Sequence, residues 1–304
     1  MSIDQCALRR KYLQKKIVDG VAIIFNANEV TRNSDCHYKY RSDSYFHYFS
    51  YFPEPDSVIF ILAGDKPQSI LFCRQKNPDL ETWEGFRFGP DAARDKYGFD
   101  EAYSIDKIGE IAPKLIAKFK SIYTPLDADQ KIQNQIQGWI NINKQQKRAG
   151  VRTPEMIVNL SHLADAMRVS KSEYEIEVMQ KSADIASEAH KLAMQKTKPG
   201  LYEYQIEGAI LNQFMQLGAK DASYQSIVAG GINACTLHYS ANNSKLRDGD
   251  LLLIDAGCEL EYYASDITRT FPVNGKFSFA QKAIYELVLA SQKASILEVK
   301  PGNS

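Results

Sequence analysis

The sequence predicts two domains, an α/β fold in the first and two long helices followed by a β-hairpin in the second. At 304 residues the chain is long enough for two separate cores. Apolar strand patterns alternate with helical patterns through the first half, which is typical of an α/β fold. Long helical patterns begin just after Val169, so we place the domains at residues 1–169 and 170–304.

The elements of the first half follow from apolar runs and the turn residues between them. Periodicity predicts helices at 4–18, 105–119 and 129–147. Buried-type runs predict strands at 21–25, 57–63, 68–72 and 122–124, of which the second and third form a hairpin. The aromatic residues between positions 38 and 52 have no basic groove around them. They therefore indicate core or interface packing rather than a surface on which bases stack.

The second half contains a helical pattern that occurs twice. Overlapping capping boxes at Ser170 and Ser172 predict the start of a helix that ends at Lys198-Pro199-Gly200. A helix at 202–217 and a strand at 226–229 follow. After the hairpin, a helix at 278–299 again ends in Lys-Pro-Gly, 102 residues after the first such ending. The recurrence suggests a half-domain duplicated in tandem.

Composition excludes several classes of partner. Lys plus Arg and Asp plus Glu both number 37, so no net charge favours nucleic acid. The N-terminus lacks an apolar signal region and no later run reaches membrane-spanning length, so we expect no membrane association. The five cysteines are scattered and never spaced as Cys-x-x-Cys, which is typical of reduced thiols. We therefore expect a cytoplasmic protein.

Residues 251–273 (LLLIDAGCELEYYASDITRTFPV) combine the pattern of a β-hairpin with two acids. An apolar run ending in Asp255 and a second run rich in β-branched and aromatic residues flank a short polar bend. With a two-residue loop at 260–261, Asp255 lies directly opposite Asp266. Two like charges facing each other on a sheet are destabilising. A bound divalent cation is the simplest reason for such a pair.

Two other interpretations of the hairpin remain open. A bulge at Gly257 would shift the register by one residue and turn one acid to the opposite face. Alternatively, Asp255 merely ends a strand at an Asp-Ala-Gly turn while Asp266 pairs with Arg269 or Arg247.

Four segments carry a resemblance to a known family. They are RSDSYFHYFSYFPEPDSV, TWEGFRFGPDAA, the helix–Lys-Pro-Gly–helix segment and LHYSANNSKLRDGDLLLIDAGCELEYYASDITRTFPVNGKFS. The most specific parts are IDAGCE and SDITRTFPV in the hairpin. Together they resemble the bacterial Xaa-Pro aminopeptidases (aminopeptidase P) of the creatinase/methionine-aminopeptidase, or pita-bread, superfamily. The resemblance implies an α/β N-terminal domain (creatinase N-terminal-like) followed by the first part of an α+β pita-bread domain.

The resemblance also implies two divalent metal ions, commonly Mn²⁺, held by five residues, of which Asp255 and Asp266 match two. The other three are a histidine and two glutamates. No histidine follows His238, and the later acids Glu286 and Glu298 lie in a predicted helix outside any family motif. We therefore expect the chain to be C-terminally incomplete relative to the family, its metal site to lack three ligands, and the chain alone to hydrolyse nothing.

The implied activity is removal of the N-terminal residue from peptides with proline in second position, by a water activated between two metal ions. His238 matches a family histidine thought to steady the substrate carbonyl or oxyanion. Trp83 matches a tryptophan reported to reach a neighbouring subunit's active site, which implies a homo-oligomer, either a dimer or a tetramer. Two alternatives stay open: a non-catalytic oligomerisation or binding protein of the same superfamily, and a prolidase.

Overall fold

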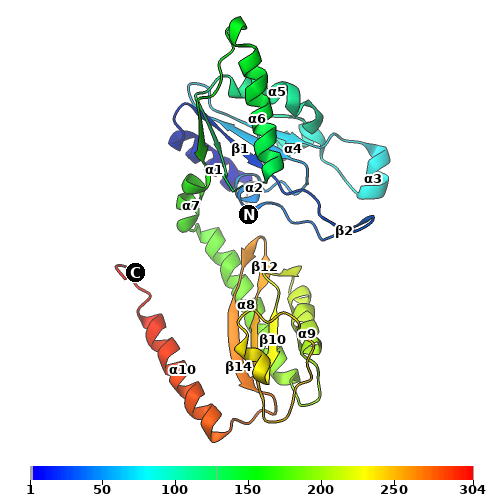
Figure 1. Cartoon of the computed structure of the whole chain (residues 1–304), viewed down its shortest axis with the longest axis vertical. Coiled ribbons are helices and arrows are strands. Elements are labelled where there is room, and N and C mark those ends of the chain that lie inside the picture. The colour runs from blue at the N-terminus through cyan, green and yellow to red at the C-terminus, as the bar shows by residue number, and fades with distance from the viewer. Residues whose placement is uncertain (1–2, 128, 304) are drawn as a thin grey trace. The chain divides into compact units, whose positions relative to one another are not determined.

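The computed structural model describes residues 3–127 and 129–303, which form two compact units. The first unit ends at Lys171 and the second begins at Ser172. Figure 1 shows the chain from blue at its N-terminus, through the α/β unit, to red at its C-terminus.

The first unit alternates helices and strands. Its helices are α1 (Ile3–Lys16), α2 (Ser44–Ser50), α3 (Pro78–Glu84), α4 (Gly89–Tyr97), α5 (Ile108–Ile116), α6 (Gln130–Gln145) and α7 (Ser161–Val169). Its strands are β1 (Gly20–Phe25), β2 (Thr31–Asn33), β3 (Cys36–His37), β4 (Val58–Leu62), β5 (Gln68–Cys73), β6 (Glu101–Ser104), β7 (Ser121–Thr124) and β8 (Met156–Asn159). The predicted hairpin β4–β5 and the helices predicted at 4–18, 105–119 and 129–147 are confirmed. The sequence did not predict helices α2, α3, α4 and α7 or strands β2, β3, β6 and β8.

The sheet of this unit has the order β6-β5-β4-β1-β7-β8 and is covered on both faces. One face packs against α1 and α2, with Leu13 and Phe49 among the buried side chains. The other face packs against α5 and α6, with Leu115 and Trp139 buried. Because both faces are buried, β1 and β4 are nearly continuous apolar runs rather than alternating ones. The predicted packing of the aromatic segment into a core is confirmed for α2.

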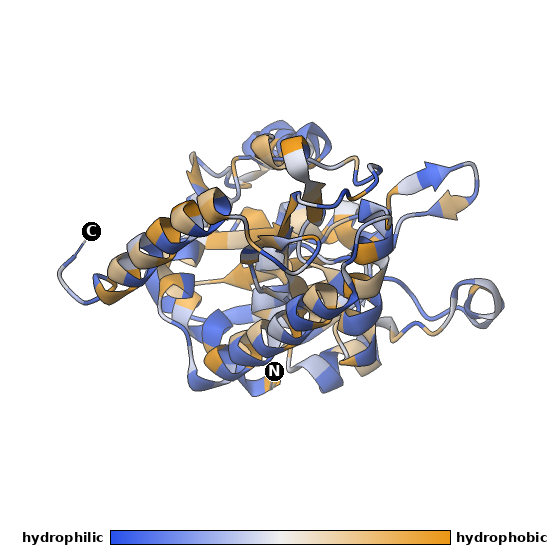
Figure 2. Cartoon of the chain, turned by 90° about the horizontal axis from the view of Figure 1, so that it is seen from below, coloured by the Kyte–Doolittle hydropathy of each residue, from blue (hydrophilic) through white to orange (hydrophobic). Residues whose placement is uncertain are grey.

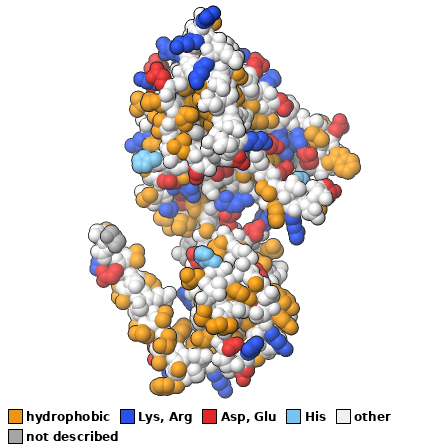
Figure 3. All heavy atoms as spheres, in the orientation of Figure 1, with side chains coloured by type: hydrophobic (Ala, Val, Ile, Leu, Met, Phe, Trp, Pro, Cys, Tyr) orange, Lys and Arg blue, Asp and Glu red, His pale blue; other side chains and the backbone are white. Residues whose placement is uncertain are grey.

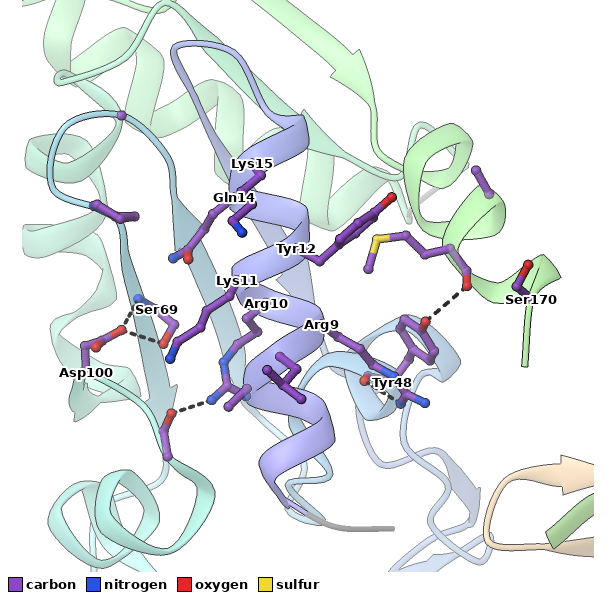
Figure 4. Close-up of a pocket in the computed structure, with 17 residues that line it drawn as sticks. Arg9, Arg10, Lys11, Tyr12, Gln14, Lys15, Tyr48, Ser69, Asp100 and Ser170 are labelled. Atoms are coloured by element: carbon purple, nitrogen blue, oxygen red, sulfur yellow. Dashed lines mark hydrogen bonds between the residues drawn. The ribbon is translucent and has the colours of Figure 1, made fainter. Parts of the chain in front are cut away.

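Two buried arginines fasten α1 to its neighbours (Figure 4). Arg10 donates from Nη1 to the Phe49 carbonyl (2.8 Å) in α2 and from Nη2 to the Tyr97 carbonyl (3.1 Å), where α4 ends. Arg9 donates to the Tyr48 carbonyl at 3.1 Å. Cations are favoured at helix C-termini, where carbonyls lack helical partners. Burial lowers the pKa of Arg10 to about 10.

The second unit consists of long helices and two small antiparallel sheets. Its helices are α8 (Glu173–Lys196), α9 (Glu203–Gln216) and α10 (Phe279–Leu297). Its strands are β9 (Asp221–Ala222), β10 (Ile227–Gly230), β11 (Leu251–Ala256), β12 (Cys258–Leu260), β13 (Tyr263–Ala264) and β14 (Ile267–Pro272). β11 is the central strand of the sheet β10-β11-β14, and β12 lies between β13 and β9. The helices predicted at 202–217 and 278–299 are confirmed as α9 and α10.

Helices α8 and α10 begin in the same way, and a Lys-Pro-Gly follows each of them. Ser172 caps α8 through a capping box, as one of the two overlapping predictions required, and Ser278 caps α10 likewise. The glycines of the two Lys-Pro-Gly endings, Gly200 and Gly302, share a left-handed φ of 95°. Yet α8 packs on the sheet, whereas none of the residues described in α10 is buried. Large apolar side chains of α10 such as Ile284, Leu287 and Val288 are exposed, and Figure 2 shows orange hydrophobic bands along the helix leading to the C-terminus.

Candidate metal centre

The sheet β10-β11-β14 is covered on one face only. Along β11 the burial alternates, and Leu252, Ile254 and Ala256 pack against α8 and α9. Successive side chains of a strand point to opposite faces. Asp255 therefore lies on the face that α8 and α9 leave uncovered, and it is half-buried. The divalent cation that the sequence predicts beside Asp255 would therefore bind on this open face.

The register of the hairpin differs from the prediction by two residues. Asp255 pairs with Thr268 and Ala256 with Ile267, so the expectation that Asp255 lies directly opposite Asp266 is wrong. The turn is formed by residues 261–262, one position later than predicted, since Leu260 pairs with Tyr263. A shift of two residues preserves the face to which each side chain points. Both acids therefore share one face as diagonal neighbours.

The turn and the kink of the hairpin are set by backbone conformation. Glu261 and Tyr262 both have left-handed φ values, 47° and 69°, as a two-residue type I′ turn requires. At Gly257 a Cβ atom would lie 1.7 Å from the Ser265 carbonyl oxygen, so only glycine fits. The predicted alternative of a one-residue bulge at Gly257 is wrong, because the pairing on both sides of it follows one register.

One hydroxyl joins the two carboxylates. Tyr224, which precedes β10, donates to Oδ1 of Asp255 and lies 2.9 Å from Oδ1 of Asp266, so its single proton is shared between them. Burial and the two carboxylates raise the pKa of Tyr224 well above its ordinary value, because ionisation would add a third negative charge. The phenol therefore stays protonated. The predicted site residues Asp255 and Asp266 are thus close together.

No cationic side chain neutralises this pair within the described residues. The ion pairs there lie elsewhere, so the alternative in which Asp266 pairs with Arg269 or Arg247 is wrong. Carboxylate oxygens suit hard ions such as Mg²⁺ or Mn²⁺. In kind, therefore, the two residues fit a divalent metal ion.

In number, the ligands are too few for a closed site. The part of the chain that the structure describes contains no group of three or more His, Cys, Asp or Glu side chains arranged to hold a metal. Asp255 and Asp266 together could supply one side of a coordination sphere. Metal ions held by one or two carboxylates retain water or take further ligands from a substrate.

A buried histidine supports the strand from behind. His190 of α8 donates from Nε2 to the Ala256 carbonyl at 3.0 Å, since a carbonyl can only accept. Burial lowers the pKa of His190, so the ring is neutral at neutral pH. The contact fixes the backbone next to Asp255 on the face opposite the carboxylate.

The other two predicted site residues lie on exposed segments. His238 lies in residues 231–244, here named the His238 loop, which follows β10. Trp83, on α3 of the first unit, is 87% exposed. Figure 3 shows hydrophobic side chains on the surface over α3. The roles predicted for His238 and Trp83 stay predictions.

Three residues that support the site, Tyr224, His190 and the buried acid Glu203, were not predicted from the sequence. Tyr224 lies between two short strands in a segment without periodic pattern. An acid in the first turn of a helix, such as Glu203, usually indicates a favourable interaction with the helix dipole. Nothing in the sequence distinguishes an exposed acid there from a buried one.

Comparison with known proteins agrees with this geometry. Residues 177–304 match metallopeptidase family M24, and residues 6–123 match the aminopeptidase P N-terminal domain. The Xaa-Pro aminopeptidase of Haemophilus influenzae is 43% identical over 94% of this chain, and that of Escherichia coli K12 is 39% identical over 97%. The solved structure of Pseudomonas aeruginosa aminopeptidase PepP is 42% identical and covers 100% of this chain, with a TM-score of 0.97.

The chain therefore belongs to metallopeptidase family M24, among the relatives named Xaa-Pro aminopeptidase. The predicted fold class is confirmed, an aminopeptidase P N-terminal domain followed by part of a pita-bread domain. The chain spans 64% of the Haemophilus influenzae relative, 68% of the Escherichia coli relative and 69% of the Pseudomonas aeruginosa structure. No helix described here is both long and apolar enough to cross a bilayer.

Proposed function

We propose that this chain functions in a metal-dependent aminopeptidase, an enzyme that removes the N-terminal residue from peptides with proline in second position. The observation that supports this most is the placement of Asp255 and Asp266 on one open sheet face, joined by one hydroxyl. The identity to relatives named Xaa-Pro aminopeptidase supports the choice of substrate class.

Asp255 and Asp266 would help to hold two divalent metal ions, for which we propose Mn²⁺ because the resemblance to the Xaa-Pro aminopeptidases implies it; carboxylate oxygens suit Mn²⁺ and Mg²⁺ alike. A divalent ion bound there supplies a water of lowered pKa and polarises the scissile carbonyl. Tyr224 orients the two carboxylates through its shared proton. His190 holds the backbone behind them. Tyr224 and His190 thus hold the two carboxylates so that they face the open side of the sheet, where a metal ion would bind.

His238 is proposed to donate a hydrogen bond to the substrate carbonyl as negative charge develops on its oxygen. Its exposure leaves the imidazole accessible to a peptide. Trp83 is proposed to contact substrate bound to another subunit of a dimer or tetramer, which its exposure on α3 permits. Location in the cytoplasm remains part of the proposal.

The decisive experiment assays Xaa-Pro-Yaa peptides with Mn²⁺, using this chain and the product of the whole reading frame that encodes it. If the reading frame continues beyond Ser304, we expect turnover by its whole product and none by residues 1–304 alone, because two carboxylates leave the metal site incomplete. A reading frame that stops at Ser304 would favour the non-catalytic alternative. Robust turnover by the 304-residue chain would contradict this expectation. Exclusive cleavage of Xaa-Pro dipeptides would instead indicate a prolidase.

Variants test the two ligands directly. Asp255→Asn and Asp266→Asn should each lower kcat/KM about 10³-fold or more in the product of the whole reading frame, since each removes a metal ligand. Asp184→Asn, an exposed acid on α8, is the matched control and should leave kcat/KM unchanged. Calorimetric titration with Mn²⁺ should show weaker binding for both ligand variants. Unchanged binding would overturn the assignment.

A further inference from the structure

Glu203 is a buried acid that the proposed mechanism does not use. It begins α9 and has 0% exposure. Its Oε1 accepts from the Gly230 amide (2.8 Å) and from Asn233 Nδ2 (2.9 Å). Its Oε2 accepts from the Tyr239 hydroxyl (2.8 Å) and from the Ser244 amide (2.8 Å). These four donors compensate the loss of hydration that burial of a carboxylate entails.

All four donors lie in the His238 loop or directly precede it. Glu203 binds the backbone on entry to residues 231–244 and again at Ser244 on exit. Between these points it binds Tyr239, the direct neighbour of His238. Apart from a 3₁₀ turn at residues 231–235, the loop has no regular structure of its own. Its conformation therefore depends on side-chain anchors of this kind.

A second contact ties the loop to the carboxylate pair. Gln225 donates from Nε2 to the Ser240 carbonyl at 3.2 Å, two residues after His238. Gln225 directly follows Tyr224, whose hydroxyl binds Asp255 and Asp266. The loop is thus held by Glu203 at both ends and at Tyr239, and at Ser240 by Gln225, the neighbour of Tyr224 in the chain.

We propose that Glu203 is a positioning residue that holds His238 at the site through the His238 loop. The inference rests on the proposed role of His238. A single carboxylate fixes both ends of the loop and Tyr239 at once. Loss of this carboxylate would displace the imidazole without touching substrate or metal. A misplacement of about 1 Å at a reacting group can cost about 100-fold in rate.

Glu203→Gln is the sharpest variant, because it keeps the shape but replaces one accepting oxygen by an amide that only donates. Tyr239→Phe is the milder second variant, since it removes one hydroxyl and leaves the buried carboxylate in place. Glu175→Gln is the matched control. Glu175 is also a buried carboxylate, but it caps α8 and accepts from Tyr263, away from the His238 loop.

The kinetic test compares these variants with and without His238→Ala in the product of the whole reading frame. We expect Glu203→Gln to lower kcat by about 10- to 100-fold with little change in KM. In the His238→Ala background it should cost less than about threefold, because the residue through which it acts is already gone. Tyr239→Phe should show the same coupling with a smaller loss.

Several kinetic results would overturn the proposal. Equal losses of kcat with and without His238 would show that Glu203 acts independently of it. A loss with Glu203→Gln no larger than with Glu175→Gln would show a general effect on folding. Unchanged kcat in both Glu203→Gln and Tyr239→Phe would likewise contradict positioning.

Hydrogen exchange on the 304-residue chain gives a readout that does not need activity. Glu203→Gln should increase amide exchange in residues 231–244 at least about tenfold and leave β11 unchanged. No increase in the loop would overturn the inference. If the wild-type product cleaves no Xaa-Pro peptide, the proposed function fails, while this measurement still decides whether Glu203 tethers the loop.

Discussion

Helices α8 and α10 are built from the same local signals but differ in burial. Each begins at a serine capping box and is followed, shortly after its last residue, by a Lys-Pro-Gly whose glycine is left-handed. The apolar side of α8 is covered by the sheet, whereas α10 leaves Phe279, Leu287 and Val288 exposed. Figure 1 shows α10 running clear of the sheet of its own unit. Capping and termination therefore define a helix, and packing is decided separately by what lies beside it.

The largest difference between the two helices is expected for truncated isoleucines. Ile185→Ala in α8 removes a buried side chain and should lower the free energy of unfolding of the second unit by about 2–4 kcal/mol. Ile284→Ala in α10 removes an exposed one and should change that free energy by less than about 0.5 kcal/mol. Urea-dependent hydrogen exchange of β11 measures both. Equal losses would show that α10 is packed in solution as α8 is.

Removing the N-terminal cap should also affect the two helices differently. The expected difference in the free energy of unfolding of the second unit is smaller than for the isoleucine variants. Ser172→Ala removes the cap of α8 and should lower the free energy of unfolding of the second unit by about 1–2 kcal/mol. Ser278→Ala removes the same kind of cap from α10 and should reduce its helix content without changing exchange in β11. Circular dichroism and hydrogen exchange measure the two effects. A comparable loss in β11 for Ser278→Ala would mean that α10 supports the sheet.

A pH-dependent difference is expected because α8 carries His190 and α10 has no histidine. The pKa of folded His190 lies below its ordinary 6.5, chiefly through burial. As pH falls below about 6.5, the histidine of the unfolded chain takes up a proton before that of the folded chain does. The second unit therefore loses stability progressively as pH falls from about 6.5 to the lower pKa of folded His190. Exchange of β11 at pH 7.5 and pH 5 measures this loss. His190→Gln should reduce the dependence, and an unchanged dependence would refute the assignment to His190.

The smallest expected effect is a stabilisation of α10, whereas the corresponding substitution in α8 should destabilise. Val288→Ala in α10 replaces an exposed β-branched residue by the best helix former and should stabilise the helix by about 0.5 kcal/mol. Val178→Ala in α8 leaves a cavity and should destabilise the second unit. Helix content by circular dichroism and exchange of α8 peptides measure the pair. Loss of helix content in Val288→Ala would show that this valine is covered.

The placement of Asp255 and Asp266 on one face could be predicted from the sequence because both lie in one hairpin, where side chains alternate with a period of two. Alternation along β11, and along β14 back to Asp266, which directly precedes it, places Asp255 and Asp266 on one face even when the register is displaced by two residues. The displacement itself could not be predicted, since Glu261 and Tyr262 adopt left-handed conformations without glycine or asparagine. The hairpin pattern depends only on residues close together in the chain, and the error in its predicted register is confined to the same residues.

The supporting residues could not be predicted because their partners are distant in the chain. Tyr224 meets Asp255 from 31 positions away, and Glu203 meets Ser244 from 41. The fold of the first unit shows the same division. Its β4–β5 hairpin was predicted, whereas β8, which joins the sheet edge beside β7, was not.

The locality of the carboxylate pair has a consequence for the order of folding. Asp255 and Asp266 are brought onto one face by a hairpin, and hairpins form in about 1–10 μs. The contacts of Glu203 with the His238 loop close longer stretches of chain, which costs more entropy before any contact is gained. We therefore expect the contact between the two acids to form earlier in folding than the contacts of Glu203 with the His238 loop.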